Sequence, residues 1–295
     1  MLKPNNDLIK ISTLSDAHKY PPVCVSEFVT PNHQLYYINA AHVNGLDNPT
    51  CQTIKRAFGL YNPKAVVVEC GGCSLYLDGY KSYLLDHVKE SKNADNECAY
   101  ATLLGLERNL PIANGEPMDS VILKELLNAG YESKDVQAFF CLQWLGQEKE
   151  RKNIHALSFH EKTTAFLQNQ RRLLSLQDSE ALTLPEYQRW FSRHYPERIG
   201  LLDISSIDTA PEESKKAHLA HRISYETNKV RDPHIVQAIT KMLNYFNSVL
   251  VVCGAGHLET QRAVFEDMLA PCQEKVLAPT VPLSQTHRND FSLKL

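Results

Sequence analysis

The chain of 295 residues carries a net charge of -3 at pH 7, and 43% of its residues are apolar. That length suits one large domain or two modest ones, and the slightly acidic balance provides no electrostatic attraction for nucleic acid. No apolar run reaches the roughly 20 residues that span a bilayer, and the first residues lack the apolar core of a signal peptide. We therefore expect a cytoplasmic protein that binds neither nucleic acid nor a membrane. Secretion without a signal peptide stays open, as does the oligomeric state.

Two apolar runs near the N-terminus predict a β-hairpin. Residues 23–29 alternate loosely between apolar and polar side chains, and residues 35–41 form an almost continuous apolar and aromatic run. The turn-forming residues from Thr30 to His33 separate the two runs. A hairpin followed by parallel strands indicates an α/β fold with a central mixed, largely parallel sheet flanked by helices.

The second of these strands opens a strand–helix–strand unit. A helical pattern through Ile54 and Phe58 follows it, and residues 65–68 then form a fully apolar run that ends at Glu69. Such a unit makes its strands parallel neighbours, so their carboxyl ends lie at one edge of the sheet, where open α/β sheets bind ligands. We therefore expect His42, at the end of the first strand, to lie beside Glu69.

The middle of the chain repeats this arrangement once and then becomes helical. A predicted helix over residues 95–109 precedes a short strand at residues 111–113, and a turn that contains glycine leads to the carboxylate of Glu116. Further helices are predicted over residues 118–128, from Ser133, over residues 163–176 and over residues 184–195. We interpret residues 118–200 as a helical insertion or cap within a single α/β domain of residues 1–295.

The C-terminal third contains the most strand-like run of the chain. In order, we expect a polar helix over residues 212–230, a separate helix that starts at Pro233, a strand over residues 249–253, a helix over residues 258–269 and a tail along the surface. His257 comes between that strand and the helix after it, directly behind Gly254, Ala255 and Gly256. The N-terminal end of a helix favours a nearby anion.

Five side chains form the candidate site. His42 and His257 each follow a strand and Glu69 ends a third, so we expect these three to converge and to serve as metal ligands if their strands are neighbours. A carboxylate after four apolar residues needs a partner, and for Glu69 that partner could be a metal, Arg231 or a histidine. Glu116 is a second acid that can act as a ligand or proton donor.

Other patterns predict weaker or no sites. His218 and His221 have the spacing of two metal ligands on a helix, but nearby lysines and arginines favour a solvated face. Cys70 and Cys73 form a lone CxxC pair without the second pair of a zinc ribbon, so reduced thiols are expected. The chain contains no GxSxG elbow, no P-loop and no GxGxxG that opens a helix, which argues against serine hydrolases, ATPases and dinucleotide-binding proteins.

The order of these motifs resembles the Tiki/TraB superfamily, which includes ChaN-type haem-binding proteins and erythromycin esterase-like enzymes. That superfamily carries two Gly-x-x-His motifs, a glutamate that ends the strand after the first, and an Arg-Asp or Arg-Asn pair before the second. Here the late motif is Gly254-Ala255-Gly256-His257, and the early one is Asn39-Ala40-Ala41-His42, with asparagine in place of glycine. Glu69 matches the glutamate, and Arg231-Asp232 matches the pair. The resemblance covers residues 35–72 and 230–269.

The resemblance implies a metal-assisted hydrolase of a peptide or ester bond, with Mn, Co or Zn as the metal and a small molecule or peptide as substrate. In that interpretation Arg231 holds a substrate carboxylate or stabilises an oxyanion. One alternative is a non-catalytic protein that binds haem or another anionic ligand, with Tyr36, Tyr37 or the histidines on the iron. The other is a catalytically dead protein-interaction module, and Asn39 is the residue that suggests it.

Overall fold

A computed structural model describes most of the chain. The described residues are 1–11, 23–40, 48–69, 97–150, 156–198, 200–201, 203–204, 206–214 and 216–277. They form an α/β fold with a six-stranded mixed sheet and a helical middle region, which confirms the predicted fold class. None of the described helices combines the length and hydropathy that crossing a membrane requires.

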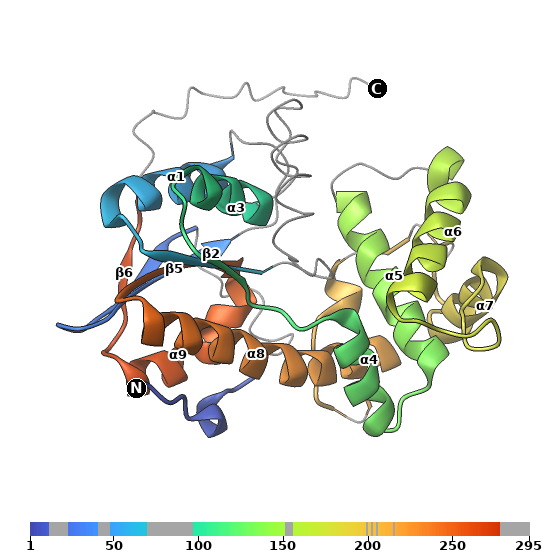
Figure 1. Ribbon diagram of the computed structural model, residues 1–295. Coiled ribbons are helices and arrows are strands. Elements are labelled where there is room, and N and C mark those ends of the chain that lie inside the picture. The colour runs from blue at the N-terminus through green and yellow to red at the C-terminus, as the bar shows by residue number, and fades with distance from the viewer. Residues whose placement is uncertain are drawn as a thin grey trace, which may run out of the picture.

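The sheet is the centre of one lobe of the molecule (Figure 1). Its strands in chain order are β1 (Val25–Val29), β2 (Gln34–Ala40), β3 (Ala65–Val68), β4 (Ile112–Asn114), β5 (Ser248–Gly254) and β6 (Gln273–Lys275). Their spatial order is β4-β3-β5-β2-β1-β6. Strands β2 to β5 are parallel to one another, and β1 and β6 are antiparallel additions at one side. The carboxyl ends of four strands therefore meet at one edge.

Helices cover both faces of this sheet. They are α1 (Pro49–Tyr61) and α3 (Glu97–Glu107) on one face, and α8 (Leu219–Tyr245) and α9 (Ala255–Met268) on the other (Figure 1). Strand residues alternate between two cores: Ile38 and Val66 pack with Ile54 of α1, while Tyr37 and Val67 pack against the face that holds α8 and α9. The side chains of β5 are buried along its whole length, as the apolar run of its sequence predicts.

The predicted hairpin is confirmed, but the tail differs from the prediction. Strand β1 pairs with β2 in antiparallel register, with Val25 opposite Ile38. After α9 the chain returns to pair β6 with β1 at the outer edge, whereas the sequence predicted only a surface tail. The three residues of β6 are exposed and polar, so they lack the apolar pattern that marks a strand.

The strand–helix–strand unit is present, but its two strands are not neighbours. Strand β5 lies between β2 and β3 and pairs in parallel with both, with Ala40 beside Gly254 and Val68 beside Val252. The predicted direct pairing of the first two parallel strands is therefore wrong. The physical reason is burial, because β5, which is buried along its whole length, occupies the centre of the sheet, where both of its edges are covered.

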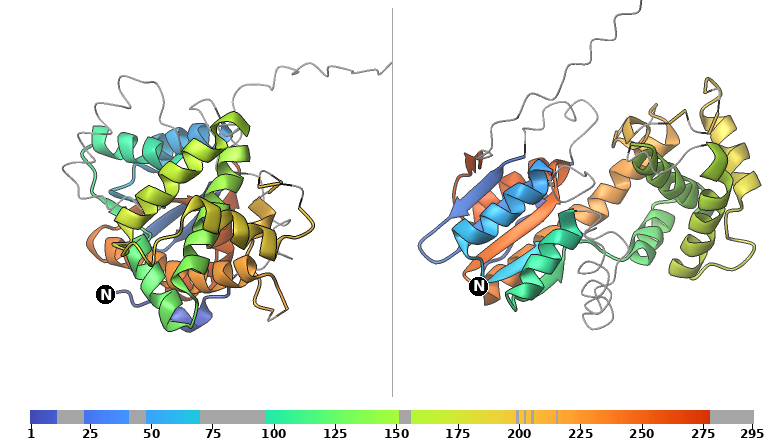
Figure 2. Two further views of the ribbon diagram at one scale, coloured as in Figure 1. Left: turned by 90° about the vertical axis from the view of Figure 1, so that its right-hand side faces the viewer. Right: turned by 90° about the horizontal axis from the view of Figure 1, so that it is seen from above.

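The described part of the middle region is helical, as predicted, and forms a second lobe (Figure 2). Its helices are α4 (Asp119–Asn128), α5 (Ser133–Glu150), α6 (Ala156–Leu173) and α7 (Leu184–His194), followed by a 3-10 turn at Ser206–Thr209. These elements share a core of their own, with Phe139, Leu142 and Tyr187 at its centre. No strand occurs between residues 119 and 194 among those described.

Helix α8 connects the two lobes as one continuous helix. Its N-terminal part contributes Ala220 and Ile223 to the core of the helical lobe, and its C-terminal part contributes Ile235 and Ile239 to the core beneath the sheet. The predicted break at Pro233 is wrong, since Pro233 lies inside the helix. Proline lacks an amide hydrogen and disfavours a helix interior, but burial on both sides of Pro233 outweighs that local cost.

Candidate metal centre

Glu69 follows the last residue of β3 and lies at the carboxyl edge of the sheet. Its backbone N–H donates to the carbonyl of Val252 (2.9 Å), which fixes it beside β5. One carboxylate oxygen lies 2.9 Å from Nη2 of Arg231, and the other accepts a hydrogen bond from the backbone N–H of Gly254. The side chain is only 9% exposed, so these contacts replace the water that a free carboxylate would bind.

Glu116 reaches the same place from the end of β4. The N–H of Gly115 donates to the carbonyl of Val68 (2.8 Å), and the N–H of Glu116 donates to the Asn114 side chain (3.0 Å). This turn directs the Glu116 carboxylate, 5% exposed, onto the same Nη2 atom of Arg231 that contacts Glu69. One guanidinium thus bridges two buried acids.

His257 completes the group from α9, the helix that follows β5. The sequence predicted that His257 precedes the helix. In the structure α9 already begins at Ala255, so His257 lies in its first turn. Its Nδ1 lies 2.8 Å from Oδ1 of Asp232, and its Nε2 lies 3.4 Å from Oε1 of Glu69. Burial lowers the pKa of His257, but the carboxylates of Asp232 and Glu69 raise it more strongly, to about 9.

The geometry and charge of this group fit a divalent cation. Glu69, Glu116 and His257 each offer one ligand atom, and these atoms lie within 4.8 Å of one another. Because Nδ1 of His257 is held by Asp232, its Nε2 is the nitrogen left for a metal, as in many histidine metal sites. Two of the three carboxylates here, Glu69 and Glu116, contact the guanidinium of Arg231, and the third, Asp232, contacts His257. Three negative charges against one positive charge leave an excess of two, which a divalent ion with a neutral imidazole would balance.

The structure therefore brings together four of the five candidate residues. Arg231 contacts both Glu69 and Glu116, and His257 contacts Glu69, although β2 does not lie directly beside β3. His42 lies outside the described residues, as do Cys70 and Cys73. Ala40, two residues before His42, pairs with Gly254, so the described end of β2 lies next to the turn that leads into His257.

Asp232 is the site residue whose role the sequence analysis missed. It was noted only as part of the Arg-Asp pair, yet its side chain is 1% exposed and bonded to His257. A signal was present in the sequence, because Asp232 precedes Ile235, Val236 and Ile239 at the spacing of one helix face. An acid on an apolar helix face indicates a buried, paired carboxylate.

Among the described residues, the other histidines, tyrosines and cysteines that the sequence singled out are not part of this group, and several contact other residues. Nδ1 of His221 lies 2.6 Å from the carbonyl of Ala210, and His218 stacks on Tyr195 in the helical lobe. Tyr36 stacks on Tyr61 with ring centroids 4.0 Å apart, on the face of the sheet opposite to His257. The described cysteines are free thiols, as expected: Cys24, Cys51, Cys98, Cys141, Cys253 and Cys272.

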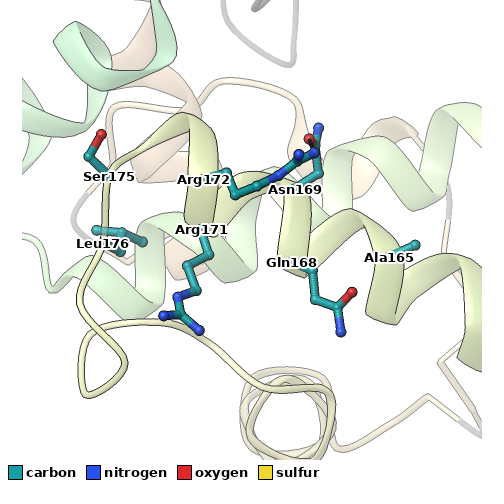
Figure 3. Close-up of a pocket in the computed structure, with 7 residues that line it drawn as sticks. All are labelled: Ala165, Gln168, Asn169, Arg171, Arg172, Ser175 and Leu176. Carbon is teal, nitrogen blue, oxygen red and sulfur yellow. Dashed lines mark hydrogen bonds between the residues drawn. The ribbon is translucent and has the colours of Figure 1, made fainter.

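A surface hollow in the helical lobe is separate from this group. It has a volume of about 830 Å³ and is lined by α6 and the turn after it (Figure 3). Its two arginines have partners of their own, since Arg171 pairs with Asp178 and Arg172 donates to Asn169 (2.6 Å). None of the predicted site residues lines it.

Comparison with known proteins does not identify a relative of this chain. No family model, curated protein or solved structure matches the chain. The functional argument therefore depends on the arrangement of these side chains.

Proposed function

We propose that the protein is a metal-assisted hydrolase of a peptide or ester bond, with Glu69, Glu116 and His257 as the metal ligands. The observation that carries this proposal is the anchored imidazole. His257 is held by Asp232 through Nδ1 and directs Nε2 toward two buried carboxylates whose oxygens lie within 4.8 Å of it. Oxygen and imidazole ligands in this combination suit Mn, Co or Zn.

The residues around the proposed ion have complementary roles in hydrolysis. A divalent cation held there would lower the pKa of a bound water and polarise a carbonyl group. Arg231 provides a fixed positive charge against the same two acids, and it would stabilise the oxyanion or hold a substrate carboxylate. Glu69 or Glu116 would accept the proton that the attacking water loses.

No observation favours the haem-binding or dead-site alternative. Tyr37, a candidate iron ligand, is fully buried, and its hydroxyl donates to Gln261 (3.4 Å). Asn39, the residue that suggested a dead site, is 1% exposed and donates to Sγ of Cys24 (3.4 Å). Neither side chain enters the Glu69, Glu116 and His257 group.

The test compares two histidine variants of the full chain. Calorimetric titration with Mn²⁺, Co²⁺ and Zn²⁺ is expected to detect binding by the unmodified protein, and an ester and a fluorogenic peptide report hydrolysis. His257→Gln is expected to lose both metal binding and metal-dependent turnover, because the nitrogen ligand is gone. His160→Gln, at an exposed position of α6, should change neither. Equal binding by the two variants, or hydrolysis that ignores the metal, would overturn the proposal.

A further inference from the structure

Asp232 is the least exposed member of the charge cluster that Glu69, Glu116, Arg231, Asp232 and His257 form. It comes from the middle of α8, its side chain is 1% exposed, and its Oδ1 lies 2.8 Å from Nδ1 of His257. An ionised carboxylate can only accept hydrogen bonds, so the proton on Nδ1 of His257 points at Asp232. The lone pair or second proton of the ring is then on Nε2, the nitrogen that faces Glu69.

A buried chain of donors holds Asp232 in this position. Gln261, one turn after His257 on α9, donates its amide to the same Oδ1 atom (2.6 Å), and its carbonyl oxygen accepts from the hydroxyl of Tyr37 (3.4 Å). Because a carboxylate accepts hydrogen bonds, the amide nitrogen of Gln261 is the atom that faces Asp232, and its carbonyl oxygen is left to accept from Tyr37. The three elements β2, α8 and α9 thus contribute to the position of one carboxylate.

The use of the two Asp232 oxygens argues against a purely structural role. Both hydrogen bonds converge on Oδ1, whereas the buried Oδ2 has no hydrogen-bond partner among the described residues. A carboxylate that only linked two helices would be more stable with both oxygens satisfied. The arrangement leaves one oxygen unsatisfied and keeps the other on the imidazole.

We propose that Asp232 is a positioning residue that fixes the tautomer and direction of His257, with Gln261 and Tyr37 as its buried support. This inference depends on the proposed function, because Asp232 would act through His257, a ligand of the same metal. Carboxylates in this position typically raise the metal affinity of the histidine ten- to a hundredfold.

The first measurement compares Asp232→Asn with Gln261→Met in the full chain. Both variants change a buried, hydrogen-bonded side chain, so both are expected to lower the melting temperature. Asp232→Asn, with a neutral side chain beside His257, should weaken Zn²⁺ binding by about ten- to a hundredfold in a calorimetric titration. Gln261→Met leaves the hydrogen bond between Asp232 and His257 in place but removes one support of Asp232, so it should weaken Zn²⁺ binding less than Asp232→Asn does.

The second measurement uses the unmodified protein and does not depend on whether a variant folds. Nitrogen NMR of histidine-labelled, Zn²⁺-loaded protein, with His257 assigned from the signal that His257→Gln lacks, reports which ring nitrogen carries the proton. We expect the proton on Nδ1 and the metal on Nε2.

The outcomes separate this inference from the proposed function. If the unmodified protein binds no metal, the proposed function and the role of Asp232 in it both fail. If the protein binds metal but Asp232→Asn binds it equally well, or the proton is found on Nε2, only the role of Asp232 is overturned. A larger loss of affinity in Asp232→Asn than in Gln261→Met, with the proton on Nδ1, supports it.

Discussion

Arg231 lies between two buried carboxylates that would otherwise repel each other. The side chains of Glu69 and Glu116 are 9% and 5% exposed, and both contact Nη2 of Arg231, which is itself 16% exposed. At such depth a charge is tolerated only while it is paired. In the absence of a metal, the guanidinium therefore offsets the repulsion between the two acids.

Substitution of Arg231 by glutamine should destabilise the metal-free protein strongly. Removal of one partner from a buried ion pair costs about 3–5 kcal/mol, so we expect a loss of that order in the free energy of unfolding, measured with urea. Saturating Mn²⁺ should recover more stability in Arg231→Gln than in the unmodified protein, because the ion then provides the missing positive charge.

Arg262→Gln is the matched control for that prediction. Arg262 also bonds two acids, Glu259 and Glu274, but these are 37% and 44% exposed. Its loss should cost less than about 1 kcal/mol, since exposed pairs contribute little. If the two substitutions cost the same, the charge cluster does not have the buried character that the structure describes.

The candidate residues differ in how well the sequence predicts them. Glu69 and Glu116 were predicted because each follows a strand, and the carboxyl edge of the sheet brings such residues together. The support of His257 by Asp232 was not predicted, because it arises from the packing of α8 against α9. The helical spacing of apolar residues after Asp232 predicts that Asp232 is buried, but it does not predict which residue Asp232 contacts.

At the scale of the elements, the N-terminus of α7 is stabilised by hydrogen bonds to one carboxylate, and the strength of these bonds depends on pH. Glu186 accepts hydrogen bonds from Lys134 of α5 (2.7 Å) and from the backbone and hydroxyl of Thr183 (2.9 and 2.7 Å). The ammonium of Lys134 and then the two bonds from Thr183 lower the pKa of Glu186 to about 2. This capping box also ties α7 to α5.

Glu186→Gln should therefore have an effect that depends on pH. A lowered pKa stabilises the folded state above the ordinary value of 4.5, and this contribution is lost as the pH falls toward about 2. Allowing for solvent exposure, we expect a loss of about 1 kcal/mol at pH 7 and less than about half of that at pH 3. Urea unfolding at both values measures it, with the exposed Glu161→Gln as control. A cost that grows on acidification would contradict this account.

The elements themselves were largely predictable, but their pairing was not. Continuous apolar runs marked β3 and β5, and the described strands match those runs closely. The insertion of β5 between β2 and β3 depends on which strand gains most from the centre of the sheet, and no local pattern encodes that choice. For the same reason α8 continues through Pro233, since its burial in two cores is a property of the whole fold.

At the scale of the whole molecule, two lobes meet along α8 (Figure 1), and two residues of the charge cluster, Arg231 and Asp232, belong to the stretch of that helix between them. They lie after the residues that pack into the helical lobe and before those that pack beneath the sheet. The helical lobe has a separate apolar core, so its stability can change without repacking the sheet.

Leu142→Ala tests this separation. Leu142 is 1% exposed in the core of the helical lobe, and its truncation should cost about 2–5 kcal/mol. Hydrogen exchange is expected to rise in α5 and α7 while β3 and β5 keep their protection. Val251→Ala, at a fully buried position of β5, should do the reverse. Equal loosening of both lobes by Leu142→Ala would show that they unfold as one unit.

The most direct test of the central claim is an anomalous diffraction experiment on crystals soaked in Mn²⁺ or Zn²⁺. The account predicts a peak about 2.0–2.3 Å from a carboxylate oxygen of Glu69, a carboxylate oxygen of Glu116 and Nε2 of His257. In the same map Nδ1 of His257 should still face Asp232. A map in which Arg231 remains between the two acids and the ion binds elsewhere, or nowhere, would contradict it.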